Sequence, residues 1–101
     1  MSSNSISAKD MARYLQNNAP VHLLDVREPI EYHTYNIGGL NIPLSLLRNT
    51  LPIADWNKQD ELIVICKVGL RSKTAQSILQ ENGYTNVRNL TGGLMALQKL
   101  K

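Results

Sequence analysis

The residue with the clearest chemistry in this chain is its one cysteine, Cys66. It follows the apolar run 62–65 and precedes a short segment that contains a glycine, an arginine and a serine. A buried strand that ends at a cysteine, followed by a tight loop and a helix start, lets several backbone N–H groups converge on the sulfur. Such donors lower the pKa of a thiol and favour its thiolate. The pattern therefore predicts a nucleophilic cysteine.

The residues after Cys66 form the predicted binding loop. They are Lys67, Val68, Gly69, Leu70, Arg71 and Ser72. We expect their N–H groups to stabilise an anion at the sulfur, with the glycine turning the amides inward. The arginine supplies a permanent planar cation, and the serine either caps the next helix or donates to the sulfur. The alternatives are a cysteine that only fills the core, a partnerless exposed lysine and an arginine that only decorates a helix start.

A second strand end carries Asp25 and Arg27, which we expect to support the site as an ion pair that braces the loop; the alternative is that they line the same crevice as the cysteine. Glu28 and Glu31 are interpreted as acids at a helix start. The two histidines, His22 and His33, have no second ligand at metal spacing, so they are interpreted as structural or surface residues. We therefore expect no metal and no other cofactor.

The order of apolar runs and turn residues predicts alternating helices and strands. Apolar runs predict strands at 21–26, 61–66 and 86–90, and a Gly-rich turn over 37–43 leads to a further short strand. Helical spacing and breakers predict helices over 8–17, 28–35, 45–51, 71–82 and 94–100. Strands alternating with helices on short connections predict an α/β domain with a mainly parallel sheet and helices on both faces. Cys66 then lies at the carboxyl end of a strand, where such folds place active sites.

Length and composition favour one ordinary globular domain over residues 1–101. The chain is 43% hydrophobic and 19% charged, and it has no apolar stretch of the roughly 20 residues that a membrane span needs. A single cysteine cannot form an internal disulfide, and the N-terminal residues lack the pattern of a signal peptide, so we expect the cytoplasm. Basic residues are scattered and aromatic residues are few, so the net charge of +3 does not predict nucleic-acid binding.

Four stretches in order make the chain resemble a single-domain rhodanese, of the rhodanese and cell-cycle phosphatase superfamily. They are Asp25-Val26-Arg27-Glu28 with Glu31-Tyr32 following; Asn36-Ile37-Gly38-Gly39 with Ile42-Pro43-Leu44; the segment from Cys66 to Ser72; and Gly83-Tyr84 with Asn86-Val87 and Leu90-Thr91-Gly92-Gly93. The resemblance implies a three-layer α/β/α sandwich around a five-stranded parallel sheet. Many rhodaneses have Gly-His-Ile-Pro-Gly-Ala where this chain has 35–40. The Asn-Ile-Gly-Gly form is similar to rhodanese domains fused to adenylating sulfur-carrier activators.

The resemblance implies a sulfurtransferase in which Cys66 takes a sulfane sulfur from a donor, becomes a persulfide and passes that sulfur to a thiophilic acceptor. Rhodanese loops place the arginine five positions after the cysteine, as Arg71 stands here, whereas the related phosphatases have one residue more. Lys67 accompanies thiosulfate-type donors in relatives. The implied partners are a small sulfur donor and a thiol, cyanide or protein acceptor. Two other functions stay open: a phosphatase or arsenate reductase using the same cysteine, and a rhodanese-like binding module without turnover.

Overall fold

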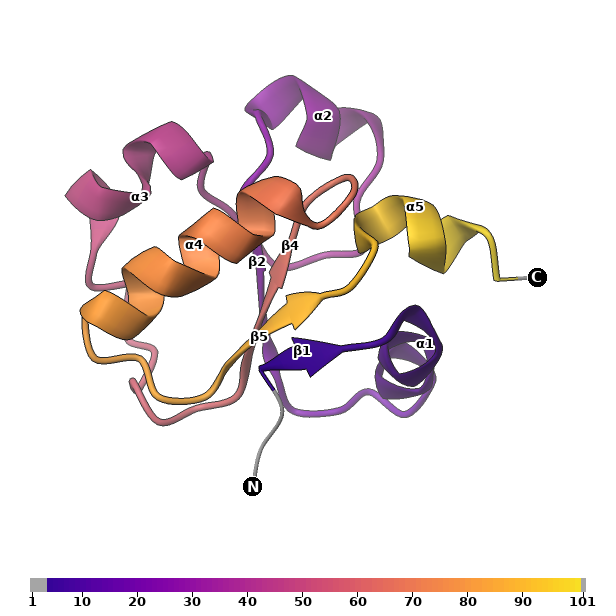
Figure 1. Cartoon of the computed structure of the whole chain (residues 1–101), viewed down its shortest axis with the longest axis horizontal. Helices are drawn as coiled ribbons and strands as arrows, with labels where there is room; N and C mark the ends of the chain where they lie inside the picture. The colour runs from indigo at the N-terminus through magenta and orange to yellow at the C-terminus, as the bar shows by residue number, and fades with distance from the viewer. Residues whose placement is uncertain (1–3, 101) are drawn as a thin grey trace.

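The protein folds around one sheet of five parallel strands, as seen in a computed structural model that describes residues 4–100 (Figure 1). The strand order is β1-β5-β4-β2-β3, so β4 lies at the centre of the sheet. The strands are β1 (Ser5–Ile6), β2 (His22–Asp25), β3 (Leu40–Asn41), β4 (Leu62–Ile65) and β5 (Val87–Leu90). Because all of them are parallel, their carboxyl ends meet at the same edge of the sheet.

Helices cover both faces of the sheet and make the outer two layers (Figure 1). The helices are α1 (Ala8–Gln16), α2 (Pro29–Thr34), α3 (Leu44–Thr50), α4 (Leu70–Glu81) and α5 (Gly93–Gln98). α3 packs beside α4 on one face, and α1 packs beside α5 on the other. α2 lies at the carboxyl edge of the sheet, close to the loop that joins β4 to α4 (Figure 1). The predicted α/β/α sandwich is confirmed.

Alternation along β4 divides the core into two clusters, one on each face of the sheet. Ile63 and Ile65 belong to the cluster under α1 and α5. Leu62, Val64 and Cys66 belong to the cluster under α3 and α4. Successive strand residues point to opposite faces, and every residue of this run is buried because the sheet is covered on both sides. The period of two therefore fixes which face the cysteine side chain occupies.

Most predicted helices and strands lie within one or two residues of their observed bounds. Three departures from the prediction, large or small, concern the sheet and the site. The strand that follows the Gly-rich turn is β3, which lies inside the predicted turn rather than after it. The helix expected from residue 71 begins at Leu70. β1 was not predicted from the residue pattern, because a two-residue strand at a sheet edge has no periodicity to reveal it. Among residues 4–100, no helix has the length and apolar character that crossing a membrane requires.

Candidate functional site

Cys66 comes directly after the central strand β4, at the carboxyl edge of the sheet. The chain then bends through Lys67, Val68 and Gly69 before α4 begins. Gly69 is the helix N-cap and has φ +95°, a left-handed conformation that residues with a β-carbon rarely adopt. The side chain of Cys66 is fully buried beneath this loop. We call residues 66–72 the cysteine loop.

Hydrogen-bond donors of the cysteine loop surround the sulfur of Cys66. The backbone N–H of Gly69 lies 3.1 Å from Sγ, and the backbone N–H of Ser72 lies 3.3 Å from it. The hydroxyl oxygen of Ser72 lies 3.2 Å from the same sulfur. Burial raises the pKa of the Cys66 thiol, but the Ser72 hydroxyl and the backbone N–H groups of Ser72, Gly69 and Val68 outweigh it, so the pKa falls below its ordinary value.

Ser72 does not cap the helix, which corrects one of the two roles expected for it. It is the third residue of α4, and no side chain caps that helix at Gly69. The serine is fully buried and faces the sulfur and Asn89 instead. The prediction placed the helix start one residue late, and this moved Ser72 closer to the cap than it is.

Backbone hydrogen bonds from the start of α5 fix the first two residues of the cysteine loop. The backbone N–H of Leu94 donates to the carbonyl of Cys66 at 2.9 Å, and that of Met95 donates to the carbonyl of Lys67 at 3.0 Å. These bonds need close approach, because a β-carbon at Gly93 would overlap the backbone of Cys66 and Lys67. The sequence indicated a tight turn at 92–93. The structure adds that this turn fixes the carbonyls of Cys66 and Lys67. These two residues come directly before the part of the loop whose N–H groups point at the sulfur.

Arg71 lies at the edge of the cysteine loop and is paired with a carboxylate of α2. Its Nη1 and Nη2 lie 2.6 and 2.9 Å from the two carboxylate oxygens of Glu31. The hydrogen bond to Arg71 is the main reason that the pKa of Glu31 falls from 4.5 to about 2. The pKa of Arg71 is raised mainly by the same hydrogen bond, with smaller contributions from the charges of Glu31, Cys66 and Asp25. Arg71 therefore joins α2 to the loop and acts on the cysteine through its charge.

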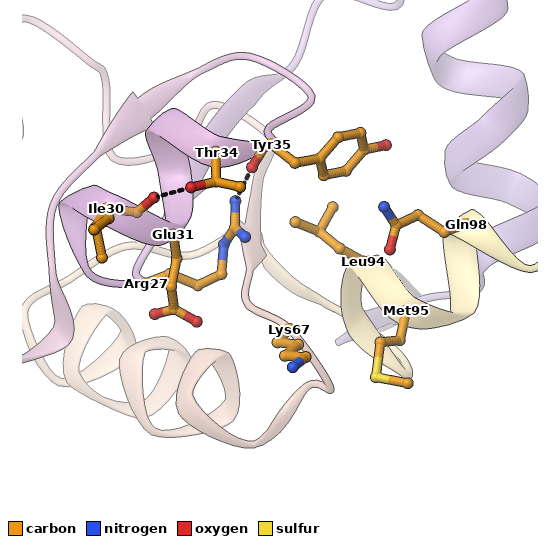
Figure 2. Close-up of a pocket in the computed structure, with 9 residues that line it drawn as sticks. All are labelled: Arg27, Ile30, Glu31, Thr34, Tyr35, Lys67, Leu94, Met95 and Gln98. Carbon is orange, nitrogen blue, oxygen red and sulfur yellow. Dashed lines mark hydrogen bonds between the residues drawn. The ribbon is translucent and has the colours of Figure 1, made fainter.

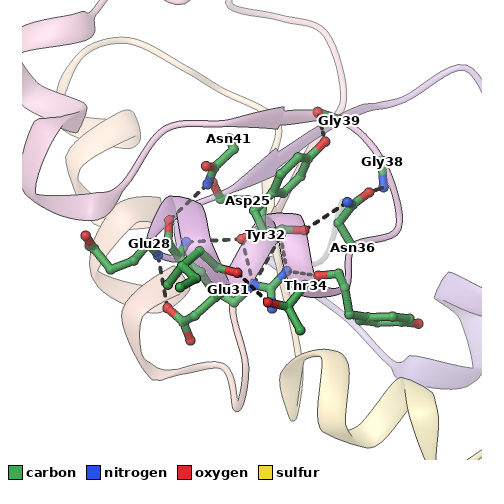
Figure 3. Close-up of polar contacts among 12 residues, drawn as sticks. Asp25, Glu28, Glu31, Tyr32, Thr34, Asn36, Gly38, Gly39 and Asn41 are labelled. Carbon is green, nitrogen blue, oxygen red and sulfur yellow. Dashed lines mark hydrogen bonds and ion pairs between the residues drawn. The ribbon is translucent and has the colours of Figure 1, made fainter.

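Glu31 makes two structural contacts, a helix cap and an ion pair, and the sequence indicated only the first. It closes a capping box at the start of α2, where its carboxylate accepts the backbone N–H of Glu28 at 3.0 Å (Figure 3). This agrees with its interpretation as an acid at a helix start. Its pairing with Arg71 was missed, because the partners are separated by 40 residues and meet only when α2 packs against the cysteine loop.

Asp25 and Arg27 form the expected ion pair, and both side chains are buried. Arg27 Nη2 lies 2.7 Å from the Asp25 carboxylate, and Nε lies 2.9 Å from its other oxygen. Beyond the pair, Arg27 Nη2 donates to the carbonyl of Tyr35 at 2.7 Å. The side-chain amide of Asn41 donates to the backbone carbonyls of Asp25 and Arg27. These bonds brace the segment from α2 to β3, whereas the brace was expected on the cysteine loop.

A groove of about 310 Å³ lies between α2, α5 and the cysteine loop (Figure 2). It is lined by Arg27, Ile30, Glu31, Thr34, Tyr35, Lys67, Leu94, Met95 and Gln98. Lys67 is exposed at its edge, and among residues 4–100 no carboxylate forms an ion pair with it. A second groove of about 430 Å³ lies on the other side of the loop, beside Val68 and Leu70. Residues of the cysteine loop therefore line both grooves, Lys67 the first and Val68, Gly69 and Leu70 the second.

The histidines lie apart from the cysteine loop, as the sequence indicated. His22 stacks on Trp56 with ring centroids 4.1 Å apart, and its Nε2 lies 2.9 Å from the Asp60 carboxylate. His33 is exposed and packs edge-on against Tyr32. Within the described range 4–100, no group of three or more His, Cys, Asp or Glu side chains is placed to hold a metal ion.

A family match, similar sequences and a similar solved structure all point to the same family. Residues 7–100 match the family described as the Rhodanese-like domain. The thiosulfate sulfurtransferase PspE of Escherichia coli is 40% identical over 86 residues, which cover 82% of each chain. The probable adenylyltransferase/sulfurtransferase MoeZ of Mycobacterium tuberculosis is 28% identical over 95% of this chain, which spans only 25% of that longer protein. The human single-domain sulfurtransferase TSTD1 is 26% identical, with a TM-score of 0.87 and 98% of both chains covered.

Proposed function

Because this chain belongs to the rhodanese family and is a rhodanese-type sulfurtransferase, we propose that it carries the transferred sulfur on Cys66 as a persulfide. The observation that carries this proposal is the convergence of the Gly69 N–H, the Ser72 N–H and the Ser72 hydroxyl on one buried sulfur. Three donors around one atom favour an anionic sulfur there. The same donors lower the pKa of the Cys66 thiol and so raise the fraction of thiolate.

The first half-reaction begins with the Cys66 thiolate and a thiosulfate-type donor. Sγ attacks the outer sulfur of thiosulfate, a new Sγ–S bond forms, and the S–S bond of the donor breaks. Sulfite leaves with the electron pair of that bond, so the enzyme holds a persulfide. Thiosulfate is proposed because the relative PspE is named for it and because Lys67 of the loop offers an exposed cation that no carboxylate among residues 4–100 pairs with.

The second half-reaction transfers the outer sulfur to a thiophilic acceptor. The acceptor attacks that sulfur, the Sγ–S bond breaks, and Cys66 returns to the thiolate. A thiol, cyanide or a protein nucleophile can serve in this role. No second cysteine is present to take the sulfur within the chain, so it leaves to another molecule. We propose a single catalytic domain in the cytoplasm, where reducing conditions keep a lone thiol free.

The remaining site residues divide by what they contact. Gly69 and Ser72 touch the sulfur directly, and Val68 adds a backbone N–H. Lys67 and Leu70 are exposed on the loop, where an incoming donor passes them. Arg71 is a positioning residue, because its guanidinium bonds to α2 and influences the sulfur through charge. Asp25 and Arg27 support the neighbouring segment.

Intact-protein mass spectrometry after incubation with thiosulfate tests this proposal. We expect the wild type to gain one sulfur, about 32 Da, and to lose it when cyanide is added. Cys66→Ser should show no gain, with circular dichroism as the check that it folds. A sulfur adduct of equal size on Cys66→Ser would contradict the proposal. So would a folded wild type that gains no sulfur from thiosulfate or from a persulfide donor but hydrolyses an aryl phosphate through Cys66.

A further inference from the structure

Asn89 lies in β5 behind the cysteine loop and is 7% exposed. Its Oδ1 accepts the hydroxyl hydrogen of Ser72. Its Nδ2 donates to the carbonyl of Gly69 at 3.3 Å. Asn89 is therefore bonded to Gly69 and Ser72, the two residues that make hydrogen bonds with the Cys66 sulfur, although Asn89 is not within the loop.

The hydroxyl group of Ser72 has one hydrogen and two neighbours that can accept it, Asn89 Oδ1 and Cys66 Sγ. When Cys66 is a thiol, its S–H can donate to the serine oxygen while the serine donates to Asn89. When Cys66 is a thiolate, it has no hydrogen to give and must accept one. The serine hydrogen then turns to the sulfur, and Asn89 Oδ1 loses its donor.

We propose that Asn89 is a positioning residue of the sulfurtransferase, which competes with the Cys66 sulfur for the single hydroxyl hydrogen of Ser72. By favouring the arrangement in which Cys66 is a thiol, Asn89 limits how strongly the serine stabilises the thiolate. This rests on the proposed function, in which Cys66 is the sulfur-carrying nucleophile. It deepens that function by naming a residue outside the loop that tunes its nucleophile.

Limiting the stabilisation of the thiolate has a chemical consequence. A thiolate that is stabilised more strongly is present at a higher fraction, but each molecule of it is a weaker nucleophile. The N–H groups of Gly69 and Ser72 already favour the thiolate without any hydroxyl hydrogen. With Asn89 present, the Ser72 hydroxyl donates to the sulfur only when Cys66 is a thiolate, whereas the two N–H groups donate in both states.

The second bond of Asn89 acts in the opposite direction and must be separated from the first. The carbonyl of Gly69 points at Asn89 Nδ2, which helps to hold Gly69 in its left-handed conformation. That conformation places the Gly69 N–H on the sulfur. Loss of this bond alone would loosen a donor and raise the pKa of Cys66. The sign of the measured change therefore shows which of the two bonds dominates.

The effect of Asn89 on Cys66 is separate from that of the charged groups around the sulfur. The elements packed around Cys66 contribute Arg71 from α4, Lys67 from the loop, Glu31 from α2 and the Asp25–Arg27 pair that follows β2. α5 has no ionisable side chain, and Arg88 of β5 is paired with Glu61. Asn89 is uncharged and contacts the cysteine only through Ser72 and Gly69. Substituting it by another neutral residue thus leaves all these charges unchanged.

The pH dependence of thiolate absorbance in the ultraviolet tests the proposal, with Cys66→Ser as the blank. Because the chain has one cysteine, the signal reports one group. We expect Asn89→Leu to lower the pKa of Cys66, with a change in its acid dissociation constant of about threefold to tenfold. We expect Asn89→Asp to raise it, because a carboxylate holds the serine hydrogen more strongly and adds negative charge.

A second background isolates the hydroxyl. In Ser72→Ala, which has no hydrogen to share, Asn89→Leu should no longer lower the pKa of Cys66. The matched control is Gln76→Leu, because Gln76 is a side-chain amide of similar burial that donates to two backbone carbonyls away from the sulfur. It should leave the pKa unchanged.

Three results would overturn the proposal: a raised or unchanged pKa in Asn89→Leu, the same lowering in the Ser72→Ala background, or a lowered pKa in Asn89→Asp. If Asn89→Leu does not fold, Asn89→Asp, which preserves side-chain size, is titrated in the wild-type and Ser72→Ala backgrounds, and a rise of the same size in both backgrounds would overturn the proposal, because the carboxylate also adds charge and loses the bond to Gly69. The titration needs no sulfur donor. A wild type that titrates as expected but takes up no sulfur would therefore refute the proposed function and not the competition for the serine hydrogen.

Discussion

Glu31→Gln removes the charge that pairs with Arg71 while changing little else. The two oxygens of Glu31 lie 2.6 and 2.9 Å from the guanidinium, so the pair is bidentate. Glutamine has the same length and can still accept the backbone N–H of Glu28, so the capping box of α2 remains. The substitution thus isolates the electrostatic attachment of α2 to the cysteine loop.

The size of the effect follows from the pKa of Glu31 and from its exposure. A fall from 4.5 to about 2 would correspond to about 3 kcal/mol of folding free energy if the carboxylate were shielded from water. The side chains of Arg71 and Glu31 are 37% and 30% exposed, so solvent screens much of this interaction. We therefore expect Glu31→Gln to lower the free energy of unfolding by about 1 kcal/mol at pH 7.

The pH dependence has a definite sign. Because the folded-state pKa of Glu31 lies below the unfolded value, its contribution is present in full at pH 7. As the pH falls below about 4.5 the unfolded state takes up the proton first, and the contribution is lost by about pH 2. The difference between wild type and Glu31→Gln should shrink across this window.

Urea unfolding at several pH values measures the difference directly. The matched control is Glu81→Gln, which removes a pair to Arg48 that is 3.6 Å long and more than 60% exposed on both sides. That variant should change the free energy of unfolding by a few tenths of a kcal/mol or less. The reasoning is refuted if Glu31→Gln matches this control at pH 7, or if its destabilisation is the same at pH 3 as at pH 7.

Two further variants test the cysteine loop. Gly93→Ala should destabilise the protein by about 2 kcal/mol or more and slow sulfur loading, because its β-carbon would overlap the backbone of Cys66 and Lys67. Gly38→Ala, which has a left-handed φ but open space around its β-carbon, should lower stability in urea unfolding while leaving loading unchanged. Lys67→Gln should raise the KM for thiosulfate roughly threefold at low salt and leave kcat nearly unchanged. Steady-state assays with Lys73→Gln, another exposed lysine, show whether the effect belongs to position 67, since an equal rise there would mean that only net charge matters.

Local patterns were sufficient to predict most of the fold and the position of Cys66 within it. The uninterrupted apolar run before Cys66 predicted a strand buried on both faces, and the glycine after it predicted a turn. The resemblance to rhodaneses supplied the fifth strand. That strand is β1, whose Ser5 and Ile6 pair with Asn89 and Leu90 of β5. No local signal marks this pairing, because it depends on how two ends of the chain meet.

The parts of the site that were missed share a physical origin. Glu31 and Asn89 are ordinary polar residues on a short helix and an inner strand, and neither has a neighbour in sequence that suggests its role. Each gains its partner from tertiary packing, across 40 residues to Arg71 in one case and 17 residues to Ser72 in the other. Sequence spacing shows which groups a single loop brings together. It does not show which distant groups the sheet places behind that loop.

The Cys66 side chain combines the burial expected of a core residue with hydrogen-bond donors of the kind expected around a nucleophile. Its sulfur is buried with Val64 and Ala75 in the cluster under α3 and α4, as a small hydrophobic residue would be. An inert buried thiol needs no donors, yet here the backbone N–H groups of Gly69 and Ser72 point at it. Those N–H groups belong to the N-cap and first turn of α4, where backbone donors have no partner within the helix. In this fold they are directed at the sulfur of Cys66, an arrangement that stabilises an anion more than a neutral thiol and so supports the proposed role of Cys66.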